Sequence, residues 1–105
     1  MAPDTVPHTA LLPTSNISVP RHVVYRSFPS ETVVLNLETG KYHGLNATAG
    51  TMLEALESAS CVSDAASVLA SRYSQPEHVI EQDMRELCNV LLERGLIEVD
   101  GGPAR

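Results

Sequence analysis

Few residues of this chain have the types and spacing that catalysis needs. A nucleophile requires a neighbouring base and an oxyanion donor, and the nearest approach to such a site is Cys61 with one of the four histidines. Nothing in the sequence positions that pair. Glu54 and Glu57 fall on the surface of an expected helix, where we expect their carboxylates to be solvated. The sequence therefore predicts a protein that is not an enzyme.

Metal-ligating and phosphate-binding patterns are also missing from the sequence. Cys61 and Cys88 are far apart and form no CxxC pair, which argues against both a zinc site and a disulfide framework. The glycines form no phosphate-binding loop. We therefore expect no metal and no cofactor, and we expect Cys88 to be a small core residue. The histidines that show no ligand spacing are His8, His22, His43 and His78.

The net charge excludes two classes of partner. A chain of 105 residues with a formal charge of −6 is one domain on length alone and lacks the basic face that displaces counterions from nucleic acid. The same charge argues against binding to an anionic membrane surface. The N-terminus has no basic region before an apolar run, and no stretch reaches transmembrane length. We expect a soluble cytoplasmic protein.

The last expected helix carries a mixed apolar and acidic stripe. Asp83, Glu86, Leu87 and Val90 lie at spacings of three and four residues, so they share one helix face. If that face meets the edge of a sheet, it makes a groove with an apolar floor and an acidic rim. Periodicity alone leaves that orientation open.

Residues 31–46 read as a β-hairpin whose second strand lies near the edge of a small sheet. A three-residue loop ending at Gly40 would place Leu37 opposite Lys41. This register puts one set of side chains on one face and a second set on the other, and a slip of one residue would exchange the faces. The first set is Val33, Leu35, His43 and Leu45, and the second is Val34, Asn36, Tyr42 and Gly44. A free strand edge is either hidden or used to bind a peptide.

Tails flank the expected domain on both sides. Residues 1–16 are rich in proline and small polar residues, and residues 99–105 are short and polar, so we expect two tails and a domain spanning 17–98. A first strand is expected within residues 17–28, broken or entered at Pro20, because proline cannot donate to a strand ladder.

Three later segments show helical spacing of apolar residues. The first runs from Ala47 to about Ser58 with Asn46 as its N-cap, and the second begins near Ser63. The third opens on a capping-box pattern, Ser74 to Glu77, and Gly95 suits its C-terminal cap. The sequence thus predicts an α+β domain in which a three-stranded antiparallel sheet precedes three helices, an order that also describes a winged helix.

Several of these segments together resemble the PqqD-like family, the RiPP recognition elements that bind leader peptides of ribosomal natural products. The similarity covers residues 22–98, and within the family the chain most resembles the discrete B1 proteins of lasso peptide pathways. Met52-Leu53 stands where the family often has a tryptophan. The segments that carry the resemblance are Leu35-Asn36-Leu37, Thr39-Gly40-Lys41-Tyr42, Leu45-Asn46, Gly50 with Leu53, Asp83 to Leu87, and Gly95-Leu96-Ile97.

The resemblance implies a winged-helix-like domain that adds the leader as a strand against its third strand, in a cleft bordered by its third helix. The implied partners are the leader of a precursor peptide and a separate cysteine leader peptidase, with no nucleic acid and no membrane. The implied leader-binding residues are Val34, Leu35, Lys41, Tyr42, His43, Gly44, Leu45, Asp83, Glu86, Leu87 and Val90.

Two other functions remain open at this point. The same fold could serve another peptide pathway, including quinone cofactor biosynthesis with a radical enzyme. A winged-helix transcription regulator is a third hypothesis, against which the acidic last helix argues, because a recognition helix normally meets phosphates with basic residues.

Overall fold

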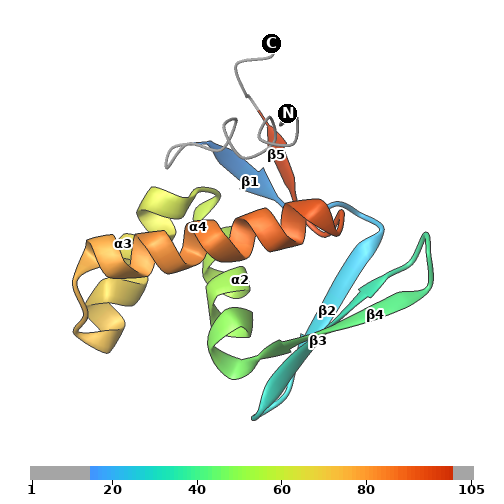
Figure 1. Ribbon diagram of the computed structural model, residues 1–105, viewed down its shortest axis with the longest axis horizontal. Helices are drawn as coiled ribbons and strands as arrows, with labels where there is room; N and C mark the ends of the chain where they lie inside the picture. The colour runs from blue at the N-terminus through green and yellow to red at the C-terminus, as the bar shows by residue number, and fades with distance from the viewer. Residues whose placement is uncertain (1–14, 101–105) are drawn as a thin grey trace, which may run out of the picture.

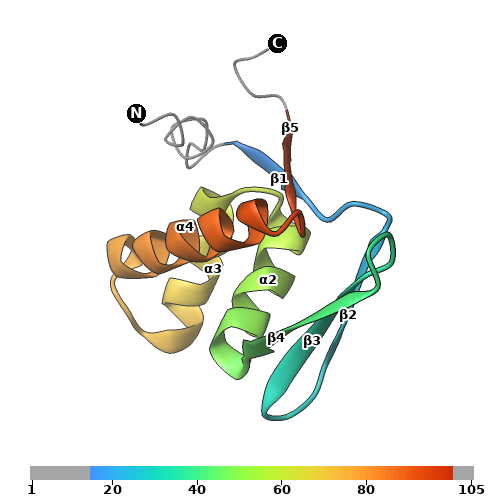
Figure 2. The ribbon, with the colours of Figure 1, turned by 45° about the vertical axis from the view of Figure 1, so that its right-hand side comes forward.

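Three antiparallel strands followed by three helices form the body of the computed structural model, which describes residues 15–100 (Figure 1). The strands β2 (Val23–Ser27), β3 (Glu31–Asn36) and β4 (Lys41–Asn46) form a sheet in the order β2-β3-β4. The helices are α2 (Ala47–Ala59), α3 (Val62–Tyr73) and α4 (Glu77–Glu93). The predicted α+β order of strands and helices is confirmed. Figure 2 shows α2 between the sheet on one side and α3 and α4 on the other.

A second, two-stranded sheet joins the two ends of the described chain. Strand β1 (Asn16–Ser18) pairs antiparallel with β5 (Glu98–Asp100), with Ile17 opposite Val99. The break expected at Pro20 is present, and it separates β1 from β2, which belong to different sheets. The sequence analysis did not foresee the β1-β5 pair, because each strand has only three residues and shows no periodicity.

Two of the predicted helix caps are confirmed and one is wrong. The Asn46 side chain accepts a hydrogen bond from the Ala49 amide at 2.8 Å and caps α2. Gly95 ends α4 at φ 72°, and the Leu96 amide donates to the Leu91 carbonyl at 2.9 Å, which is the Schellman arrangement. Ser74 does not form a capping box with Glu77. It is the left-handed C-cap of α3, and Pro76 is the N-cap of α4.

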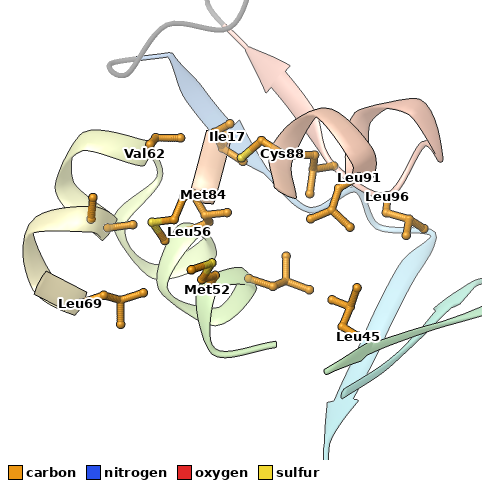
Figure 3. Close-up of a cluster of buried hydrophobic side chains, with 14 of the residues drawn as sticks. Ile17, Leu45, Met52, Leu56, Val62, Leu69, Met84, Cys88, Leu91 and Leu96 are labelled. Carbon is orange, nitrogen blue, oxygen red and sulfur yellow. The ribbon is translucent and has the colours of Figure 1, made fainter. Parts of the chain in front are cut away.

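The core fills the space between the three helices and the inner face of the three-stranded sheet. Figure 3 shows Leu45 of β4 at one side of this cluster and Leu69 of α3 at the other. Cys88 is fully buried in it, as expected, and burial raises the pKa of its thiol to about 12. A thiol in that setting stays protonated at neutral pH and does not act as a nucleophile.

Helix α2 lies so close to β3 that Gly50 has no room for a side chain. A Cβ built at Gly50 would lie 2.0 Å from Oγ1 of Thr32, a buried residue on the inner face of the sheet. The conformation of Gly50 is ordinary, so glycine is needed here for the close approach and not for its backbone freedom.

Two acidic residues further along α2 also join the helix to the sheet, through hydrogen bonds with β2. The Ser27 hydroxyl donates to Glu54 Oε2 at 2.6 Å, and the Tyr25 hydroxyl donates to Glu57 Oε1. Burial, together with the neighbouring Glu57 carboxylate, raises the pKa of Tyr25 above its usual value. Glu54 and Glu57 are exposed on the helix surface, as expected, but each also accepts a hydrogen bond from β2.

Replacing Gly50 by alanine should destabilise the fold. Overpacking at such a site costs about 1–3 kcal/mol, while alanine returns only about 1 kcal/mol of helix propensity. Because the built Cβ would lie far inside contact distance of Thr32, we expect the upper part of that cost, and a net fall of about 1–2 kcal/mol in the free energy of unfolding, measured in urea.

Gly44→Ala is the matched control for Gly50→Ala. A Cβ at Gly44 meets nothing closer than Glu31 Oε1 at 3.7 Å, which is ordinary contact. Gly44→Ala should leave the urea midpoint nearly unchanged. A Gly50→Ala protein as stable as the wild type would contradict the close approach of α2 to β3.

Candidate functional site

The register of the β3-β4 hairpin differs by one residue from the register expected from the sequence. Asn36 lies opposite Lys41 and Leu35 opposite Tyr42, so the loop has four residues, Leu37–Gly40, and not three. The cause is Asn36. Its side chain accepts a hydrogen bond from the Glu38 amide at 2.9 Å, and its carbonyl accepts one from the Gly40 amide at 2.7 Å. These bonds end the strand at Asn36 and begin the turn there.

The shift exchanges the two faces of β3 and leaves the faces of β4 as expected. Val34, His43 and Leu45 lie on the inner face, toward α2, while Leu35 and Tyr42 lie on the outer face. Leu45 is buried as expected, but the core placement of Leu35 was wrong. Val34 is 0% exposed, so its side chain belongs to the core and does not line a binding surface.

The far edge of β4 carries no strand within residues 15–100. The Leu37 amide donates to the His22 carbonyl at 2.7 Å and the Phe28 amide to the Glu31 carbonyl, so odd-numbered residues of β3 bond to β2. Because antiparallel ladders alternate, even-numbered β3 residues bond to β4 through residues 41, 43 and 45. The amides and carbonyls of Tyr42 and Gly44 therefore point to the free edge.

A cavity lies at the end of this edge, where β4 enters α2. It has a volume of about 380 Å³ and joins the first turns of α2 to the start of α4. Asp83 and Val79 line it from α4, and Met52 lines it from α2. The full lining is Thr48, Met52, Tyr73, Gln75, Val79, Ile80 and Asp83.

The structure divides the predicted α4 stripe. Asp83 lines the cavity between α2 and α4, Leu87 is half-buried against the core and Val90 is exposed. Glu86 instead lines a separate cavity on the outward side of α4, together with His78 and Arg85 among others. The sequence analysis missed Val79, although it stands one helical turn before Asp83 on the same face, and it missed Tyr73, for which the sequence carried no signal.

The strand residues predicted for the site have different roles in this geometry. Tyr42 and Gly44 offer backbone groups at the edge, and the Tyr42 ring, 71% exposed, lies on the outer face. His43 is half-buried on the inner face, and Lys41 is exposed beside the turn, its amide donating to Thr39 Oγ1 at 3.2 Å. The arrangement can pair with an extended peptide through main-chain hydrogen bonds.

Other kinds of site are not seen in the part of the chain that the structure describes. Within residues 15–100, no three His, Cys, Asp or Glu side chains gather in a way that could hold a metal ion. Cys61 stands at the N-cap of α3 and makes no capping hydrogen bond through its thiol. None of the helices in this range is long and apolar enough to cross a membrane.

Comparison with known proteins gives one family and two similar structures. Residues 31–97 match the family model of coenzyme PQQ synthesis protein D, PqqD. The chain of "TbiB1 in complex with the TbiA(beta) leader peptide" is 26% identical, with a TM-score of 0.68, and the match covers 80% of this chain and 95% of that one. The chain of "Lasso peptide synthetase B1 complexed with the leader peptide" is 24% identical, with a TM-score of 0.69 and coverage of 79% and 98%, and it supports the fold alone. No protein of curated function matches the sequence.

Amide hydrogen exchange tests the free edge without any ligand. We expect the Tyr42 and Gly44 amides to exchange rapidly, because they face solvent, and the His43 and Leu45 amides to be protected by bonds to β3. Two-dimensional NMR after transfer to D₂O measures all four in one sample, so the strand serves as its own control. The reverse pattern, with Tyr42 and Gly44 protected, would refute the register described above.

Proposed function

Because its residues 31–97 match the family model, this chain belongs to the PqqD family, and we propose that it binds the leader of a ribosomal precursor peptide as a strand added to β4. The free backbone groups of Tyr42 and Gly44, beside a cavity lined by α4, are the observation that carries the proposal. Strand addition draws affinity from main-chain hydrogen bonds and specificity from pockets for alternate side chains.

The inner face of the edge provides those pockets. A peptide strand beside β4 directs every second side chain toward the inner face, where His43 and Leu45 of β4 lie. We place Asp83 and Leu87 of α4 on the same side of the bound peptide. Asp83 is exposed and makes no ion pair within the described residues, so it favours a leader with a lysine or arginine near its anchor residues.

The peptide pathway that we propose is lasso peptide biosynthesis. The resemblance to the discrete B1 proteins of lasso peptide pathways favours it, and the chain named TbiB1, 26% identical to this one over most of its length, is in complex with a leader peptide. The protein is then a non-catalytic recognition element of the cytoplasm, which delivers the leader to a separate cysteine leader peptidase.

A second candidate is a leader-binding chaperone in quinone cofactor biosynthesis. The matching family model bears the name of a coenzyme PQQ synthesis protein, which favours this alternative. Titration with the leaders of both peptide classes, under the same conditions, separates them. Nucleic-acid binding has no such support, since α4 presents Glu77, Glu81 and Glu93 to solvent.

Replacing Gly44 by proline should weaken leader binding while the domain stays folded. Proline removes the amide that faces the free edge, and proline is tolerated on an edge strand when its nitrogen faces solvent. The lost hydrogen bond and the bulk of the ring should raise the Kd of the leader at least about tenfold, which corresponds to about 1.4 kcal/mol. Fluorescence anisotropy with a labelled leader measures the Kd.

The control for this variant is Gly44→Ala, which keeps the amide and adds only a Cβ in ordinary contact. Gly44→Ala should bind within about twofold of the wild type, a difference of about 0.4 kcal/mol. Equal leader affinity in folded Gly44→Pro and Gly44→Ala proteins would exclude strand addition at this edge.

Replacing Leu87 by arginine should also weaken leader binding, through the side-chain wall of the groove. Leu87 is half-buried, and a long cationic chain there would fill the space beside β4 and repel the basic leader that Asp83 favours. Gln82→Arg, on the exposed outward side of α4, adds the same charge away from the groove. Isothermal titration should show a clear loss of affinity for the first variant and none for the second. Unchanged affinity in a folded Leu87→Arg protein would remove α4 from the site.

A further inference from the structure

The outer face of the three-stranded sheet is apolar and uncovered within the described residues. The helices pack against the inner face, and Figures 1 and 2 show none of them on the other side of the sheet. Phe28 is 49% exposed and Val24 46% exposed on this face. A cavity of about 370 Å³ opens there between the strands. We call this surface the outer face and define it by six residues of that lining, Val24, Arg26, Phe28, Val33, Leu35 and Tyr42.

The composition of the outer face is that of a protein interface. The chain has only one phenylalanine and three tyrosines, and the phenylalanine and one tyrosine stand exposed here. Aromatic residues and arginine carry much of the binding energy of protein interfaces. A contiguous exposed apolar surface of this kind marks an interaction site.

Arg26 indicates the charge of the partner. Among these six residues it is the charged one, it is exposed, and it forms no ion pair within residues 15–100. The exposed Glu31 lies on the same side of the sheet, opposite Asn46 at the end of β4. A second copy of this chain would set two bodies of net charge −6 together, which disfavours self-association. The face therefore fits a different protein, one that presents an apolar surface with a carboxylate.

The outer face is continuous with the edge at which the leader is proposed to bind. Tyr42 contributes its backbone to the free edge and its ring to the outer face. A strand added to β4 would place its outward side chains beside Tyr42. A protein docked on the outer face would then lie next to the bound peptide.

We propose that the outer face is the docking surface for the enzyme that acts on the bound peptide, with a carboxylate of that enzyme meeting Arg26 among apolar contacts. The inference rests on the proposed function. Docking and peptide binding are separable, because Arg26 lies on β2, two strands away from β4 and about 10 Å from it at the usual strand spacing, and Phe28 follows the end of β2 in the turn to β3.

The test uses the full chain, its precursor peptide, and the cysteine leader peptidase of the same organism. Arg26→Glu and Phe28→Ala, made separately, should each lower the rate of leader cleavage at limiting peptidase at least tenfold. Both should leave the Kd of the leader unchanged. Val68→Ala, which truncates an equally exposed apolar side chain on α3 (53% exposed), should change neither quantity.

Each other result has a defined meaning. If the leader binds but neither Arg26→Glu nor Phe28→Ala changes the rate of leader cleavage, the proposed docking surface is wrong and the proposed function stands. If the leader fails to bind the wild-type protein, both the proposed function and the docking surface are rejected. If sedimentation shows a wild-type dimer that Phe28→Ala dissociates, a second copy occupies the face and the inference is overturned.

Discussion

The close approach of α2 to β3 at Gly50 is the constraint on which the arrangement of this protein depends. With no Cβ at that position, the helix lies directly on Thr32, and the hydrogen bonds of Glu54 and Glu57 to β2 fix its direction across the sheet. The inner face is thereby covered by a helix that follows β4 without a loop. Because α2 leaves β4 at its end and not along its side, the backbone edge of β4 stays open.

Strand β4 then serves two surfaces with different chemistry. Its edge offers the amides and carbonyls of Tyr42 and Gly44, which pair with any extended chain, so selectivity must come from side chains on either side of the ladder. On the inner side we place His43 of β4 and Asp83, which lines the cavity between α2 and α4. On the outer side they are apolar residues with Arg26, in a setting that suits a folded protein partner. If both proposals hold, one short strand brings a peptide and the enzyme that acts on it into contact.

Most of the fold, but only part of the candidate site, could be predicted from the sequence. The order of strands and helices, the Asn46 cap and the Gly95 terminus follow from local patterns and are confirmed. The predicted hairpin register was wrong because the Asn36 side chain starts the turn one residue earlier than expected. Apolar residues occur on both faces of β3, so the sequence pattern did not distinguish the two registers. The contacts of Glu54 and Glu57 with β2 depend on tertiary packing that no local pattern reports. The leader-binding residues and the division into tails and domain stay predictions.

The central claim is that a peptide pairs with the edge of β4, and scalar couplings across hydrogen bonds test it most directly. In a complex of ¹⁵N,¹³C-labelled protein and labelled leader, the account predicts couplings between the Tyr42 or Gly44 amides and leader carbonyls, and between leader amides and the carbonyls of the same two residues. Leader binding with no such coupling at either residue, and with contacts at another surface, would contradict the account.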